Sequence, residues 1–319
     1  MRSPHALVAS LALAVLLPSV SAPARAGSAP PRDDYARADF AAPLGGALRA
    51  FYARDFADAR KGFETALAAV PDNTLALSFL NATAAQTPGD LEALVDEEED
   101  ALGKTPKSEL AHVRLAFSYL FVSTIGRDRT QDAREELNAA LALDPDSQAA
   151  HTGLGIMREN ERSANRAKTE FLAALETDPN NVLAREYLAQ IYQTDLKDPQ
   201  RALAEIVNVP NLVPDYADIY FHLASVMQDL GQNGAAVAYA TRGLQTDVGH
   251  VGEAGKYGYT LLARIYIDER RLDDARRVLK AAISAGTDSE YASTLLAKLD
   301  AGAFGKPGAS PPPAARKKP

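Results

Sequence analysis

Small and apolar residues return along this chain at the offsets of paired α-helices. Gly155, Ala167, Ala174 and Pro179 follow one another at intervals of 12, 7 and 5 residues. Small side chains at such offsets let two helices cross closely, and the proline ends the second helix because it lacks an amide proton. The same intervals separate three further sets and part of a fourth: Ala47, Ala59, Ala66 and Pro71; Ala82, Leu94, Ala101 and Pro106; Ala224, Ala236, Gly243 and Val248; and Ala263, Ala275 and Ala282. The unit recurs about every 34 residues, a period typical of helical-hairpin repeats.

The hairpin around Gly155 has the clearest pattern. Its sequence predicts a first helix over 148–160 and a second helix over 164–177. Gly155 leaves room on the first helix for the second to approach. The second helix carries an apolar stripe of helical period, formed by Ala167, Phe171, Ala174 and Leu175.

The whole pattern predicts an all-α protein, a right-handed superhelical solenoid of about seven helical hairpins. Each hairpin in such an array packs only on its neighbours. The expected spans are 40–72, 73–107, 108–146, 147–180, 181–215, 216–249 and 255–286. A final helix from Ser289 to Leu299 would cap the array, since a terminal repeat needs a solvated outer face.

These residues resemble the tetratricopeptide-repeat (TPR) family over about residues 40 to 286. The resemblance is carried by Leu154-Gly155, Ala167, Phe171, Ala174-Leu175 and Asp178-Pro179, and again by Tyr220, Leu223-Ala224, Gly231, Ala236 and Leu244. It implies that the first helices line a concave face and that peptides or partner helices bind in this groove.

The two ends of the chain differ from the array. Residues 1–26 have the features of a cleavable signal peptide: a basic start, an apolar stretch from Ala6 to Leu17 and small residues at Ala24-Arg25-Ala26. The alternatives are an uncleaved membrane anchor and a buried N-terminal helix. We expect a disordered spacer over 27–39, the solenoid over 40–300 and a disordered, proline-rich basic tail over 301–319.

The composition of the chain limits which cellular compartments and which classes of partner we expect. The chain has no cysteine, so it is neither a lipoprotein nor disulfide-bonded, and a periplasmic or secreted location is expected. Its formal net charge is −8, which argues against nucleic acid and anionic membranes as partners. No stable membrane insertion is expected after the signal is cleaved.

No catalytic, cofactor or metal site is visible in the sequence. The five histidines are scattered, and His112 and His151 occupy positions where the family places large packing residues. The acidic run from Asp96 to Asp100 lacks the ligand pattern of a calcium loop, so we interpret it as a solvated outer helix face.

The groove-facing turns supply candidate partner-binding residues. The resemblance assigns this role to Arg114, Phe117, Phe121, Ile156, Tyr187, Gln190, Phe221, His222 and Arg264, with Glu186, Gln193 and Ser225 on the same turns. Phe117, Tyr187 and Phe221 are the expected anchors. Co-chaperone members of the family bind an acidic C-terminus with a set of basic residues. This chain lacks that set, because residues such as Glu186 and Phe221 occupy the matching positions.

We therefore expect a non-enzymatic scaffold that binds protein partners in a concave groove, within the bacterial cell envelope. The alternative is an accessory subunit of polysaccharide synthesis or export, or of another envelope secretion machine. In that case groove tyrosines would stack on sugar rings, although a glycan is the less favoured ligand.

Overall fold

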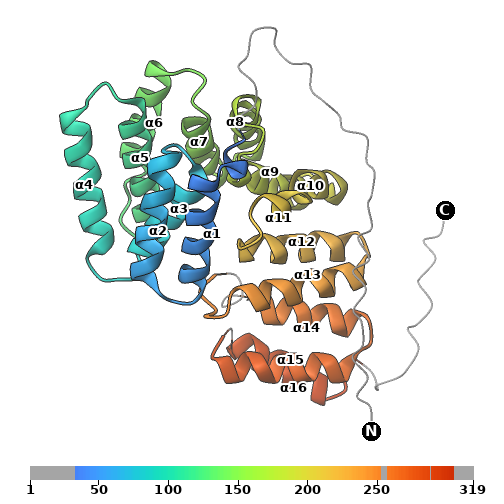
Figure 1. The fold of residues 1–319 in the computed structure, drawn as a ribbon. Coiled ribbons are helices and arrows are strands. Elements are labelled where there is room, and N and C mark those ends of the chain that lie inside the picture. Colours follow the sequence, from blue (N-terminus) through green and yellow to red (C-terminus); the bar gives the residue numbers. More distant parts are fainter. Residues whose placement is uncertain (1–32, 253–256, 288, 305–319) are drawn as a thin grey trace, which may run out of the picture. The chain divides into compact units, whose positions relative to one another are not determined.

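The computed structural model describes residues 33–252, 257–287 and 289–304, and within these ranges every element is a helix and none is a strand. The expected all-α repeat fold is therefore confirmed (Figure 1). The helices are η1 (Asp34–Ala36), α1 (Ala38–Tyr52), α2 (Phe56–Ala69), α3 (Thr74–Ala84), α4 (Asp90–Lys104), α5 (Glu109–Thr124), α6 (Thr130–Leu143), α7 (Gln148–Asn160), α8 (Ala164–Thr177), α9 (Val182–Thr194), α10 (Pro199–Ile206), α11 (Val209–Leu212), α12 (Ala217–Asp229), α13 (Asn233–Thr246), α14 (Tyr259–Asp268), α15 (Leu272–Ala285) and α16 (Ser289–Asp300).

Neighbouring helices pack as hairpins, as the spacing predicts. The most extensive packing joins α1 to α2, α5 to α6, α7 to α8, α9 to α10, α12 to α13 and α14 to α15. The first helices of these hairpins also contact one another in order, α3 with α5, α5 with α7, α7 with α9 and α12 with α14. We call α1, α3, α5, α7, α9, α12 and α14 the first-helix row.

Two glycines explain how closely the hairpin helices approach. A Cβ atom on Gly155 of α7 would overlap the Phe171 ring of α8. A Cβ atom on Gly243 of α13 would lie 2.6 Å from Cζ of Phe221 on α12. The small residues that mark the repeat in the sequence therefore make room for a phenyl ring of the opposite helix.

Polar caps fix where several first helices begin. Asn73, Ser147 and Asn181 each accept a hydrogen bond from the backbone N–H three residues later, at 3.0, 3.2 and 2.9 Å. Such caps satisfy amide groups that the helix itself leaves unpaired. All three caps are buried, so they also take part in contacts between helices.

Helices of the first-helix row that are far apart in the sequence also contact one another. Helix α3 packs on α9, where the Thr74 hydroxyl donates a 3.0 Å hydrogen bond to Oδ1 of Asn181. The Gln148 amide donates a 2.7 Å hydrogen bond to the backbone oxygen of Asp72. The rings of Phe79 on α3 and Tyr216, just before α12, meet edge to face with centroids 5.6 Å apart.

Helix α1 is held against later parts of the chain as well. Arg49 forms an ion pair with Asp215. Tyr52 and Arg54 meet residue 249: the backbone N–H of Gly249 donates to the Tyr52 oxygen at 2.6 Å, and Nε of Arg54 donates to the Gly249 oxygen at 2.9 Å. Asp72 and α3 thus lie against the starts of α7 and α9, and the end of α1 lies against Gly249, contacts that the repeat pattern does not predict.

The folded region begins earlier than the sequence indicates. Within the expected spacer, residues 34–36 form η1 and α1 begins at Ala38. The side chain of Tyr35 is buried, and its hydroxyl accepts a 3.3 Å hydrogen bond from Asn73. These contacts tie the segment to the start of α3.

At the other end, α16 packs on α15 and buries Ala292, Leu295 and Leu299. Most of the expected tail and the whole expected signal peptide, residues 305–319 and 1–26, lie outside the described residues. None of the helices described here combines the length and the apolar character needed to cross a bilayer.

The acidic run on α4 is solvent-exposed, as expected, except at Glu98. Glu98 is buried and pairs with Arg114, with 2.7 Å between Nη2 of the arginine and Oε1 of the glutamate. Glu97 pairs with Arg60, and Glu99 accepts a 2.6 Å hydrogen bond from Tyr119. Three of the five carboxylates therefore hold α4 to its neighbours.

Candidate functional site

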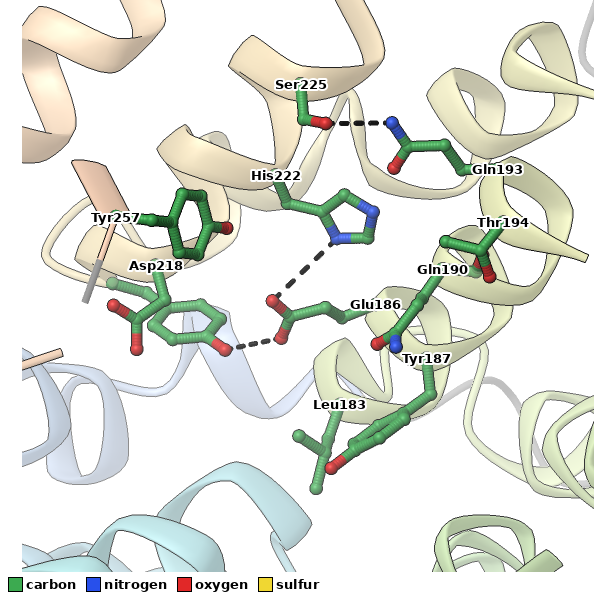
Figure 2. Close-up of a pocket in the computed structure, with 11 residues that line it drawn as sticks. Leu183, Glu186, Tyr187, Gln190, Gln193, Thr194, Asp218, His222, Ser225 and Tyr257 are labelled. Carbon is green, nitrogen blue, oxygen red and sulfur yellow. Dashed lines mark hydrogen bonds and ion pairs between the residues drawn. The ribbon is translucent and has the colours of Figure 1, made fainter. Parts of the chain in front are cut away.

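A cavity of about 470 Å³ lies between α9 and α12 (Figure 2). Two aligned helix faces form most of its wall. On α9 the lining residues follow steps of three and four, and on α12 they do the same, so each set shares one helix face. The lining residues are Leu183, Glu186, Tyr187, Gln190, Gln193, Thr194, Tyr216, Asp218, His222, Ser225 and Tyr257.

Glu186 and His222 face each other across the cavity (Figure 2). Oε1 of Glu186 lies 3.9 Å from Nδ1 of His222, which is too far for a hydrogen bond. The other carboxylate oxygen accepts a hydrogen bond from the Tyr216 hydroxyl. Burial lowers the pKa of His222 to about 4, so this side chain is neutral at neutral pH.

Tyrosine rings supply the apolar part of the cavity. The ring of Tyr187 stacks on Phe171 with centroids 5.4 Å apart. Burial, followed by the charges of Glu186 and Glu159, raises the pKa of Tyr187 to about 12. Burial likewise raises the pKa of Tyr216. These phenols stay protonated at neutral pH and can donate hydrogen bonds.

Amide and hydroxyl groups cross the space between the two helices. Nε2 of Gln193 on α9 donates to Oγ of Ser225 at 2.9 Å and to Oδ2 of Asp229 at 2.6 Å, both on α12. Gln190 and Thr194 lie at the exposed rim. A ligand at the cavity mouth therefore meets polar groups first and aromatic rings deeper in.

Ser225, His222 and Glu186 are the residue types of a hydrolase triad, but their geometry differs from one. The Ser225 hydroxyl accepts from Gln193 and forms no hydrogen bond with His222. The gap of 3.9 Å between His222 and Glu186 does not orient the imidazole either. Over the ranges that the structure describes, no group of three or more histidine or acidic side chains could hold a metal ion.

The structure brings together three of the residues expected to bind a partner, Tyr187, Gln190 and His222. Four others lie elsewhere. Arg114 pairs with Glu98, and Arg264 is exposed on α14. Phe121 and Ile156 are half-buried against the main hydrophobic core.

The two expected phenylalanine anchors need correction, because both lie in the core. Phe221 has no exposed surface and packs against Gly243 and Gly258. Phe117 is 4% exposed on α5, which is packed by α3, α4, α6 and α7. Adjacent positions on a helix point about 100° apart, so the face that carries His222 into the cavity turns Phe221 toward α13.

Sequence reasoning missed five of the lining residues. Asp218 lies one turn before His222 on α12, so helical spacing could have found it. Tyr216 precedes that helix by one residue. Leu183 and Thr194 belong to the face of α9 that also carries Tyr187 and Gln190. Tyr257 comes from the connection before α14, where no periodic signal exists.

No family model matches the chain. A segment of 191 residues, 59% of the chain, is 26% identical to the human protein O-mannosyl-transferase TMTC3. That match spans only 20% of the human protein's length.

Solved structures share the fold at low sequence identity. PilW, described as a widely conserved type IV pilus biogenesis factor, aligns with a TM-score of 0.55 and 20% identity, covering 69% of this chain and 98% of that one. PilF of Pseudomonas aeruginosa aligns with a TM-score of 0.51 and 20% identity, covering 62% and 85%. Both PilW and PilF are TPR proteins. At this level of identity the likeness establishes the fold.

Proposed function

We propose that this chain, whose fold is that of tetratricopeptide-repeat proteins, is a non-enzymatic scaffold that binds a segment of a partner protein. The binding site is the cavity between α9 and α12, and the compartment is the bacterial cell envelope. Tyr187, Gln190 and His222 contact the partner in this proposal.

One observation carries the proposal. Helix α3 lies against the start of α9 and Asp72 against the start of α7, whereas the cavity of about 470 Å³ between α9 and α12 stays open. Its mixture of rings, amides and acceptors suits an extended or helical peptide, which needs apolar contacts for affinity and polar contacts for register. This site is smaller than the groove that the resemblance implies.

Site-specific photocrosslinking tests the proposal. A benzoylphenylalanine replaces Gln190 at the cavity rim, and in a control it replaces Leu172, which is 41% exposed on α8. We expect a protein adduct in the native cell from position 190 and none from position 172. Adducts of equal yield at both positions, or none at either, would contradict the proposal.

A second candidate function is an accessory role in an envelope assembly or polysaccharide export machine. The likeness to PilW, a pilus biogenesis factor by its description, favours such a machine. Three tyrosines in the cavity suit sugar rings as well as peptides. A glycan array separates the two ligands: a peptide-binding scaffold gives no carbohydrate signal, and a signal lost in Tyr187→Ala would favour the export role.

The signal-peptide pattern in residues 1–26 and the absence of cysteine support the proposed envelope location. We expect mass spectrometry of the protein from native cells to find an N-terminus at or near Gly27. A chain that retains Met1 would favour the uncleaved anchor instead.

A further inference from the structure

We propose that the cavity between α9 and α12 takes a cationic side chain, an arginine or a lysine of the bound protein segment. This inference rests on the proposed function and names the chemistry of its ligand. It reverses the charge preference of the co-chaperone relatives, whose basic grooves bind acidic C-termini.

The charges around the cavity have one sign. Glu186 and Asp218 line it, and none of the lining residues that the structure describes is lysine or arginine. His222, the remaining basic group in the wall, is neutral because burial lowers its pKa to about 4. Asp229 extends the acidic surface along α12 through its hydrogen bond with Gln193.

These carboxylates already have partners within the protein. Glu186 accepts from Tyr216, and the backbone of Gly252 closely approaches Asp218. Their contribution to binding is therefore a negative potential in a partly desolvated space, where screening by solvent is weaker than at an open surface. A cation at the rim gains from both charges without displacing either contact.

The tyrosines add a second, independent preference for a cation. Tyr187, Tyr216 and Tyr257 contribute three rings to the wall. The face of an aromatic ring carries negative charge density and attracts guanidinium and ammonium groups. The same pairing occurs within this protein: Arg129 lies 4.0 Å from the centroid of Tyr119, and Arg271 lies 4.3 Å from that of Tyr266.

A buried carboxylate oxygen beside the cavity supports the same preference. Oε2 of Glu159, at the end of α7, is buried without a hydrogen-bond partner. Its charge acts on Tyr187 in the cavity wall. An unpaired buried oxygen costs free energy that a cationic ligand nearby would reduce.

Selection from a random nonapeptide library on the immobilised full-length protein tests the inference. Peptides that also bind the Gln190→Trp variant are discarded, since a bulky neutral ring at this exposed rim residue obstructs the cavity mouth without adding a charge. We expect the remaining peptides to share an arginine or lysine at one position. Replacing that residue by citrulline or acetyl-lysine, which keep the shape and remove the charge, should weaken binding at least about tenfold.

Variants at the rim supply the matched controls. Gln190→Glu should strengthen binding of the basic peptides about threefold, and Gln190→Lys should weaken it by about three- to tenfold. Gln190→Met, which removes the amide without adding a charge, should give an affinity between those of the two charged variants. A lysine at Leu172, on α8, should have no effect.

The outcomes separate this inference from the proposed function. Peptides that depend on the cavity but tolerate citrulline would overturn the cation preference and leave the scaffold role intact. A library that yields no cavity-dependent peptide would contradict both. Enrichment of acidic peptides would overturn the inference directly.

Discussion

One position of the repeat carries a polar side chain that forms the same contact in several hairpins. In four first helices, a polar side chain reaches the backbone oxygen of the proline six residues earlier, at 2.8 to 3.3 Å. The pairs are His112 with Pro106, His151 with Pro145, Arg185 with Pro179 and Tyr220 with Pro214. The two histidines are thus structural, as their repeat position indicates, and each also contacts a glutamate of the second helix.

His222 should make the stability of the protein depend on pH. Its folded pKa of about 4 lies below the ordinary 6.5, so the unfolded chain binds a proton between these values that the folded chain does not. The contribution of His222 to the free energy of unfolding is fully present above pH 6.5. It is lost as the pH is lowered toward 4, and the loss amounts to about 3 kcal/mol. Urea unfolding of the wild type and of His222→Gln across this range measures the difference. Equal pH dependence in both proteins would contradict the burial of a neutral imidazole.

Gly155 should not tolerate a side chain. Because a Cβ atom there overlaps the Phe171 ring, we expect Gly155→Ala to destabilise the protein by about 1–3 kcal/mol. Gly234→Ala is the matched control, since nothing lies within 4 Å of a Cβ atom at that position on α13. The control should be neutral or stabilising by up to about 1 kcal/mol, because alanine favours helix more than glycine does. Thermal unfolding of both variants provides the comparison.

At the scale of elements, sequence periodicity predicts the helices well and their contacts less well. The expected helices over 148–160 and 164–177 coincide with α7 and α8, since apolar spacing, caps and proline are all local signals. The same signals do not reveal that α4 packs more extensively on α5 than on its hairpin partner α3. That contact depends on charged pairs between residues such as Glu98 and Arg114, and the sequence of α4 alone does not specify its partners.

The Glu98–Arg114 pair should control how firmly α4 is attached. Arg114→Met leaves the carboxylate of Glu98, which is 6% exposed, without its cation, at a cost of about 3 kcal/mol. We expect faster amide hydrogen exchange throughout α4, measured by mass spectrometry. The double variant Arg114→Met and Glu98→Met should recover most of the protection. Unchanged exchange in the single variant would mean that α4 is held by its apolar face alone.

At the scale of the whole molecule, contacts between distant helices distinguish this chain from a linear stack of repeats. A simple solenoid has contacts only between neighbours, so its parts can unfold separately. Here α3 meets α9, and Arg54 bonds to a residue 195 positions away. The sequence predicts the repeats but not this closure, because the spacing of small residues reports contacts within a hairpin. For the same reason, Gln190 and His222 could be placed on the correct helix faces, whereas the contact of α3 with α9 could not be predicted.

Gly249 offers a test of this coupling. A Cβ atom there would lie 2.6 Å from the backbone oxygen of Tyr52, so we expect Gly249→Ala to destabilise the contact by about 1–2 kcal/mol. Hydrogen exchange should then accelerate in α1 and α2 although the substitution lies after α13. Gly234→Ala, on α13 itself, should leave α1 and α2 unchanged. Faster exchange confined to the residues around 249 would show that the two regions are independent.

The bonds between α1–α3 and residues 181–252 also determine when these helices can finish folding during synthesis. Buried groups such as Tyr52 and Thr74 find their partners only after Gly249 and Asn181 have been made. At the usual pace of translation, the ribosome needs roughly 10 to 40 seconds to add the residues that separate Tyr52 from Gly249. The N-terminal helices therefore keep apolar surface open to water until the later segment has emerged, from the ribosome or from an export channel. A chaperone that shields residues 33–84 during this interval should raise the yield of native protein.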